Sequence, residues 1–216
     1  ARDLVTGAHR YPSDIKRPGM LYGKILRPPS YGAELTSVDL SKAKAIPDVE
    51  VVRDGAFIGF VAPTTYQAEQ ALKITAESAT WTKAAHPSSD QLFEHLSQHQ
   101  GRGRPRVRGS VTDAMAAAKH AVNATYQIAY VQHTPMEPRA ATAEWKDGKL
   151  TVWTGVDGPQ RVQSDLARAL GISNDDVRVI VPDMGGGFGG KHTGEAAEEA
   201  ARLARAVGRP VAVHWT

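Results

Sequence analysis

The feature that most constrains the fold is a glycine-rich loop, GGGFGGK at 185–191. An apolar β-branched run at 177–181 precedes it and an alanine-rich helical pattern follows it, so the context predicts strand, loop and helix. Glycine lacks a Cβ, so such a loop can reach positive φ and leave its backbone N–H groups unshielded. The unpaired donors and positive dipole end of the following helix add to these groups. The loop therefore predicts a site for an anion or an oxygen-rich cofactor.

Two nucleotide-binding patterns fit this loop only in part. The G-x-G-x-x-G spacing is present, but the next strand, at 211–215, carries no acidic residue at its end to bind a ribose. The start of a P-loop is also present, but His192 stands where that motif needs a Ser or Thr for Mg²⁺. A turn that only packs a helix against a sheet is the third alternative. Five glycines around one phenylalanine are more than such a turn needs.

Composition and charge narrow the function classes. The chain has 216 residues with 26 Lys and Arg, 23 Asp and Glu, and a net charge of +3, which suits one large or two small globular domains. Nucleic-acid binding is not expected, because the one basic cluster alternates with Gly and Pro and lacks aromatic neighbours. That cluster is Arg102, Arg104, Arg106 and Arg108.

The absence of cysteine excludes disulfides, thiolate zinc sites and iron–sulfur clusters held by this chain. No apolar run approaches the roughly 20 residues of a membrane span. The sequence starts at Ala1 without a methionine, which indicates processing or excision from something longer.

Residues 1–85 alternate between strand and helix patterns and predict a compact α+β unit. The predicted elements are a strand at 20–26, a hairpin at 49–61 turning at Asp54-Gly55, a helix opened by a Thr64-to-Gln67 capping box, and a strand at 79–82.

Residues 86–110 are polar and rich in Ser, Gln, His, Gly, Pro and Arg, which is the composition of a linker. His95 and His99 lie four residues apart within it. No acidic residue is placed as a third ligand, so no metal site is predicted there.

Residues 111–216 again mix helices and strands. The predicted elements are a helix at 113–121, a strand at 122–131, a hairpin of 140–145 and 150–153 about Asp147-Gly148, a helix at 160–170 closed by Gly171, a strand at 177–181, a helix at 194–207 and a strand at 211–215. Three glutamates near the start of the last helix are expected to face solvent and not to act in acid–base chemistry: Glu195, Glu198 and Glu199.

Three segments in this order resemble the large subunit of the xanthine oxidase and aldehyde oxidase family of molybdenum hydroxylases. They are HTPMEP at 133–138, the Trp153 strand with Pro159 and its helix, and MGGGFGGK at 184–191 followed by a helix and GRPV at 208–211. Within that family, the segment at 133–138 and the residues after the glycine-rich loop resemble the isoquinoline 1-oxidoreductase β-subunit type. The resemblance implies an α+β fold: an α/β hammerhead domain at 1–85, a linker at 86–110, and the first part of a molybdopterin-binding α/β domain at 111–216.

The resemblance also implies roles for the glycine-rich loop. The backbone amides of Phe188 and Gly189 would point at an oxo ligand of molybdenum, as in an oxyanion hole. Gly186, Gly187 and Gly190 would let the pterin approach the backbone. Phe188 and His192 would border the substrate pocket. No residue of the chain is expected to be catalytic or to bind the metal directly, because the family's catalytic glutamate lies beyond the stretch that ends at Thr216. The chain is thus expected to be an N-terminal fragment, inactive alone.

Two positions depart from the family pattern. Val156-Asp157 stand where the family has a Thr-Gln pair whose glutamine touches the oxygen ligand of the metal. A carboxylate there is repelled unless it is protonated or turned away. His192 stands where purine oxidisers have a substrate-binding glutamate, so aromatic N-heterocycles or aldehydes are expected in place of purines. His133 and Glu137 are expected to be structural, satisfying backbone in a proline-rigidified turn.

The implied cofactor is molybdenum-molybdopterin, in its cytosine dinucleotide form. The implied partners are the remainder of the large subunit, a small subunit with two [2Fe–2S] clusters, a flavin or cytochrome subunit, and a small-molecule substrate. Two alternatives stay open at this point: a non-catalytic scaffold of the same fold, and a nucleotide-phosphate-binding α/β domain. The compartment, cytoplasmic or periplasmic, is not indicated.

Overall fold

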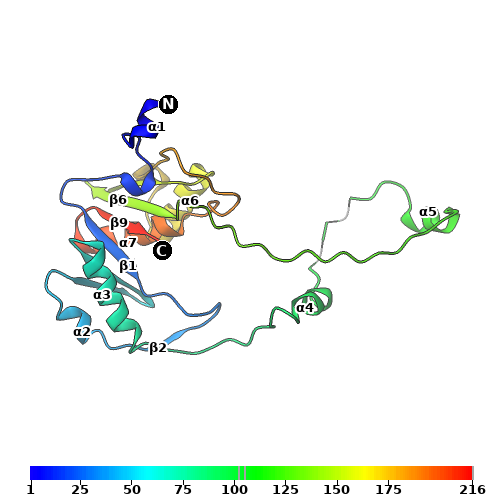
Figure 1. Cartoon of the computed structure of the whole chain (residues 1–216), viewed down its shortest axis with the longest axis horizontal. Coiled ribbons are helices and arrows are strands. Elements are labelled where there is room, and N and C mark those ends of the chain that lie inside the picture. Colours follow the sequence, from blue (N-terminus) through cyan, green and yellow to red (C-terminus); the bar gives the residue numbers. More distant parts are fainter. Residues whose placement is uncertain (102, 105, 216) are drawn as a thin grey trace. The chain divides into compact units, whose positions relative to one another are not determined.

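The computed structural model describes residues 1–101, 103–104 and 106–215, and the chain forms two units. Unit 1 contains residues 1–83 and 132–216, and unit 2 contains residues 84–131 (Figure 1). The candidate site lies in unit 1. Of the basic cluster, Arg102 lies outside the described residues.

A seven-stranded mixed sheet forms the centre of unit 1, in the order β3-β4-β1-β9-β6-β7-β8. Neighbours pair antiparallel except β1 with β9 and β7 with β8, which are parallel. The strands are β1 Leu21–Ile25, β3 Glu50–Asp54, β4 Phe57–Ala62, β6 Ala140–Lys146, β7 Lys149–Thr154, β8 Val177–Ile180 and β9 Val211–His214. A separate two-stranded sheet pairs β2 (Leu35–Ser37) with β5 (Thr80–Trp81).

Both predicted hairpins of the large sheet are confirmed. Asp147 and Gly148 connect β6 to β7 with φ of 51° and 77°, the two positive values that a type I′ turn requires. The β3–β4 turn lies one residue later than predicted. Asp54 still pairs with Phe57, so Gly55 and Ala56 form the turn, with Gly55 at φ 61°.

Helices cover both faces of the sheet. A core that includes Ile58 and Phe60 packs under α2 (Ser41–Lys44) and α3 (Thr65–Ala76). A second core packs under α6 (Pro159–Leu170) and α7 (Glu195–Val207). The predicted helix ends are confirmed, and so is one of the two hydrogen bonds of the predicted capping box. Thr64 accepts a hydrogen bond from the Gln67 N–H at 3.2 Å, and α6 and α7 end at left-handed glycines 171 and 208. The short helices of unit 1 are α1 Arg2–Thr6, η1 Pro12–Asp14 and η2 Asn174–Asp176.

Strands from both sides of the predicted boundary at residue 85 share the large sheet, through the β1–β9 pair. Leu203 of α7 also lies directly over two strand glycines. A Cβ added at Gly23 or at Gly59 would lie 2.4 Å from the Leu203 side chain. The α+β class is therefore confirmed, with the two sequence segments packed as one body. The separate hammerhead and cofactor-binding domains remain a prediction.

Unit 2 differs from the prediction in three places. The predicted linker contains a helix, α4 (Leu92–Gln98), and the next helix, α5 (Val111–Ala117), begins earlier than expected because Ser110 caps it. The predicted strand at 122–131 is wrong: the structure has no strand there. Alternating apolar residues favour an extended backbone, but a strand also needs a partner, and no described strand pairs with this segment.

His214, at the end of β9, gives a testable pH dependence. Burial lowers the pKa of its imidazole, Lys16 and Lys24 lower it further, and Asp14 opposes them. The unfolded chain, with a histidine pKa of about 6.5, then binds more protons than the folded chain, so stability should fall as the pH drops below about 6.5. Urea denaturation between pH 5 and 8 should show this slope, and His214→Gln should flatten it. Equal slopes in both proteins would contradict the assignment.

Candidate functional site

The glycine-rich loop connects β8 to α7, so the predicted order of strand, loop and helix is confirmed. A hydrogen bond from the Gly190 N–H to the Gly187 carbonyl, at 2.7 Å, closes its tightest turn. Gly186, Phe188 and Gly189 have positive φ, at 96°, 49° and 91°. Phe188 is thus a non-glycine residue in the left-handed region, which carries backbone strain and is frequent at functional sites.

The loop leaves a run of backbone donors unused. Among the described residues, none accepts a hydrogen bond from the amides at 186–189, whereas the amides of Gly185 and Gly190 are bonded. Phe188 is 76% exposed. Successive unpaired N–H groups in a glycine turn suit a ligand with several oxygen acceptors. These residues therefore fit the oxygen-rich cofactor that the sequence predicts.

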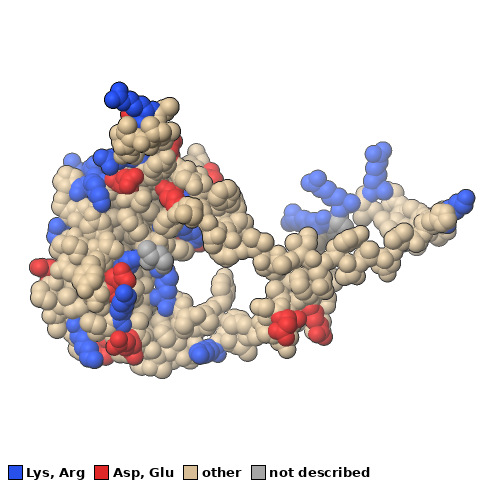
Figure 2. Space-filling view, viewed as in Figure 1, with Lys and Arg blue, Asp and Glu red and all other residues tan. Residues whose placement is uncertain are grey.

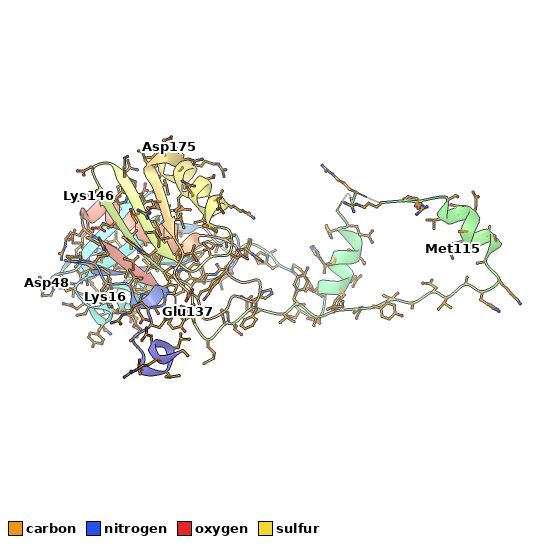
Figure 3. The ribbon with its side chains drawn as sticks, turned by 90° about the horizontal axis from the view of Figure 1, so that it is seen from above. Lys16, Asp48, Met115, Glu137, Lys146 and Asp175 are labelled. Carbon is orange, nitrogen blue, oxygen red and sulfur yellow. The ribbon has the colours of Figure 1, made fainter. Side chains whose placement is uncertain are left out.

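The segment 133–139 lies against this loop. Oε2 of Glu137 accepts hydrogen bonds from the Gly185 N–H at 2.8 Å and from Nζ of Lys191 at 2.6 Å. Figure 3 labels Glu137, which lies beside the short helix η1. The predicted structural role of Glu137 agrees with its bond to the backbone.

The same segment explains why the loop needs its glycines. A Cβ added at Gly190 would lie 2.9 Å from the His133 Cβ, and one at Gly185 would lie 3.0 Å from the Glu137 Cβ. Both distances are shorter than nearly all contacts that real Cβ atoms make. The glycines thus serve two purposes, since they allow positive φ and they let segment 133–139 pack directly on the loop.

Arg139 ties the far end of the loop to the sheet, a role that the sequence analysis missed. Its Nε donates to the Gly190 carbonyl at 2.8 Å, and its Nη1 donates to Glu195 at 2.9 Å. Its guanidinium lies 4.9 Å from the ring centre of Trp215, and that of Arg27 lies 4.4 Å from the same ring. In the sequence, Arg139 stands two residues after Glu137, but this spacing matches no motif that would have predicted its role.

The expectation that the three glutamates of α7 face solvent is wrong for Glu199. Its side chain is 15% exposed and binds Arg27 at 2.6 Å and the Trp215 indole N–H at 2.8 Å. Burial raises the pKa of the Glu199 carboxyl, although Arg27 and Trp215 oppose the shift. Both partners are distant in sequence, so a helical wheel could not reveal them. Glu195 and Glu198 are 48% and 43% exposed.

The two positions singled out by the sequence, Asp157 and His192, lie together. Oδ2 of Asp157 contacts Nδ1 of His192, and the Asp157 N–H donates to the Lys191 carbonyl at 3.3 Å. Their side chains are 45% and 59% exposed. The loop after β7 therefore lies beside the glycine-rich loop, and the Asp157 carboxylate is directed to a histidine of that loop. The places of Phe188 and His192 at a substrate pocket remain predictions.

Neither the charged side chains on the visible face of unit 1 nor the potential metal ligands of the described residues mark another site. Acidic and basic side chains are interspersed over the visible face of unit 1 (Figure 2). His95 and His99 of unit 2 stack with ring centres 4.1 Å apart, and no group of three or more potential metal ligands occurs among the described residues. The candidate site therefore rests on the backbone of the glycine-rich loop.

Comparison with known proteins shows the family of the chain. Residues 93–216 match the protein family described as "Molybdopterin cofactor-binding domain". The chain is 30% identical to a subunit of nicotinate dehydrogenase from Pseudomonas putida KT2440, over 98% of this chain and 19% of that protein. It is 28% identical to the β-subunit of isoquinoline 1-oxidoreductase from Brevundimonas diminuta, over 98% of this chain and 29% of the other.

A solved structure, quinoline 2-oxidoreductase from Pseudomonas putida 86, superposes with a TM-score of 0.77 at 25% identity. The superposition covers 100% of this chain and 33% of that one. The chain thus spans about a third or less of the length of these relatives.

Proposed function

The chain belongs to the molybdopterin cofactor-binding domain family, among the large subunits of xanthine-oxidase-type molybdenum enzymes, and on that premise we propose that its glycine-rich loop forms one wall of the cofactor site. The residues proposed to contact the cofactor are Gly186, Gly187, Phe188, Gly189 and Gly190.

The run of amides at 186–189, for which no described residue is a hydrogen-bond acceptor, carries this proposal. When bound, the cofactor supplies the oxidation chemistry and oxygen atoms that can accept hydrogen bonds. The Phe188 and Gly189 N–H groups would donate to such an oxygen, and the hydrogen bond from Gly190 to Gly187 fixes the turn that carries them. Preorganised donors of this kind stabilise developing negative charge without reorganising during the reaction.

The Asp157–His192 pair favours a cofactor role over a scaffold that has lost it. An unpaired carboxylate at position 157 would repel a negatively charged oxygen ligand. Because Asp157 is directed to His192, a hydrogen bond from the imidazole would weaken the negative potential that the loop after β7 presents to the cofactor. His192 and Phe188 would then border the substrate.

We further propose the activity of the complete enzyme. It would hydroxylate a carbon next to nitrogen in an aromatic heterocycle, or an aldehyde carbon, with water as the oxygen source. The names of the three relatives support the heterocycle, since nicotinate, isoquinoline and quinoline all contain an aromatic nitrogen ring. The cofactor would be the cytosine dinucleotide form.

Electrons would leave through a small subunit with two [2Fe–2S] clusters and then a flavin or cytochrome subunit. The clusters must lie on another polypeptide or segment, because this chain has no cysteine. The catalytic base would also lie outside residues 1–216, so this chain alone would be inactive.

Among the described residues, no helix is long and apolar enough to span a membrane.

Molybdenum and pterin contents of the full-length gene product test the proposal. We expect the wild-type protein to contain both and Phe188→Pro to lose most of each. Proline removes the N–H and cannot adopt the positive φ of 49° at this position. Phe188→Ala keeps the amide and should keep the cofactor.

Asp48→Pro is the matched control. Asp48 is an exposed non-glycine residue with φ of 62° in a turn that precedes β3, so proline meets the same backbone conflict there. Its cofactor content should stay near the wild-type level. A wild-type protein without molybdenum or pterin would instead favour the scaffold.

A further inference from the structure

We propose that Glu137 and Lys191 form a buried clamp that holds the two ends of the glycine-rich loop together. We infer that this clamp positions the loop amides for the cofactor, a second step that rests on the proposed function. Glu137 and Lys191 are thus positioning residues, because neither is assigned a contact with substrate or cofactor.

Both ends of the loop converge on one oxygen atom. The first residue, Gly185, donates its N–H to Oε2 of Glu137 at 2.8 Å, and the last residue, Lys191, donates its ammonium to the same oxygen at 2.6 Å. The residues between them, 186–190, therefore form a closed arch whose two ends are bound to a single carboxylate. A closed arch has far fewer backbone conformations than an open one.

The Glu137–Lys191 ion pair is buried, in contrast to the exposed pair on α3. The Lys191 side chain is 3% exposed and that of Glu137 is 11% exposed. The exposed pair of Glu69 and Lys73 on α3, at 2.8 Å, is 40% and 63% exposed. Exposed pairs contribute little to stability, whereas removing one partner of a buried pair leaves the other charge without compensation.

The hydrogen bonds of Glu137 are directed to the loop alone. Its second oxygen, Oε1, is buried and has no partner among the described residues. The clamp is reinforced by Arg139 of the same segment, whose Nε donates to the Gly190 carbonyl.

The test uses the full-length gene product with three variants: Glu137→Gln, Lys191→Met and the double variant. Glutamine keeps the shape and an acceptor for Gly185 but loses the charge, and methionine keeps the apolar stem of the lysine. Within the peptide at 184–192, hydrogen exchange of the two hydrogen-bonded loop amides, those of Gly185 and Gly190, should be about tenfold faster in each single variant. The double variant should be less affected than either single one, because no buried charge is left alone. Exchange in β6 and β9 should not change.

Molybdopterin content and the molybdenum EPR signal of the same preparations test the second step. Pterin content should fall in both single variants and partly recover in the double variant, and the EPR signal should be perturbed in the single variants. The matched control is the exposed pair, changed as Glu69→Gln and Lys73→Met. These variants should match the wild type in exchange, pterin content and EPR signal.

Each contrary result points to one step. Unchanged loop exchange in both single variants would overturn the clamp. Faster exchange with wild-type pterin content and an unchanged EPR signal would overturn the positioning role. A wild-type protein that lacks molybdopterin would overturn the proposed function, while its loop exchange would still decide the clamp.

Discussion

Gly190→Ala is expected to displace the glycine-rich loop and to reduce the bound molybdopterin to a small fraction of the wild-type amount. The added Cβ would lie 2.9 Å from the His133 Cβ and 3.2 Å from the Gly187 carbonyl oxygen. The Gly187 oxygen cannot move away easily, because it accepts the Gly190 N–H at 2.7 Å. Overpacking of this kind typically costs about 1–3 kcal/mol, which the loop can avoid only by shifting away from segment 133–139.

Two comparisons sharpen this experiment. His133→Ala should not rescue Gly190→Ala, because the clash is with the His133 Cβ and not with its ring. Gly101→Ala is the control, since a Cβ at Gly101 meets nothing within 4 Å and its φ is not positive. Pterin fluorescence per polypeptide is the measurement. A Gly190→Ala protein with full pterin content would contradict the close packing described for the loop.

Gly59→Ala is expected to destabilise the sheet, by about 1–3 kcal/mol if the strands and α7 adjust as in other overpacked cores. The new Cβ would lie 2.4 Å from Leu203 of α7, on a strand that is buried on both faces. Gly23→Ala should behave similarly, because its Cβ would meet the same leucine at 2.4 Å. Urea denaturation of each variant gives the loss of stability.

Shortening the leucine provides the internal check. Leu203→Ala should itself cost about 2–5 kcal/mol, since Leu203 is fully buried. In that background, Gly59→Ala should cost much less than in the wild type, because the clashing atoms are gone. Equal costs in the two backgrounds would show that Leu203 does not determine the need for glycine on β4.

The local elements of unit 1 were predictable because their signals are short-range. The hairpin at Asp147-Gly148, the Thr64 cap and the glycine that ends α6 each depend on residues within a few positions of one another. The predicted strand at 122–131 failed for the complementary reason. Its alternating pattern describes one strand, whereas a sheet needs a second backbone that the pattern does not specify.

The candidate site was predictable only in part. The glycine-rich loop was evident from composition and order, and the outlier residue Phe188 lies within it. The contacts that shape the loop were not evident, because Glu137 and Arg139 lie about fifty residues away from Gly185 and Gly190 in sequence. Glu199 was misjudged for the same reason, since Arg27 and Trp215 bury it from distant parts of the chain.

The sequence by itself determined the seven strands of the large sheet and the helices α3, α6 and α7, although not α1, α2 or β2, and it placed a run of glycines between β8 and α7. It did so because turn, cap and periodicity preferences act between neighbours along the chain. Tertiary structure alone decided that β1 and β9 join two sequence segments in one sheet, and that a single carboxylate binds both ends of the loop. These contacts depend on which distant segments bury their apolar surface against each other, and no local sequence pattern contains that information.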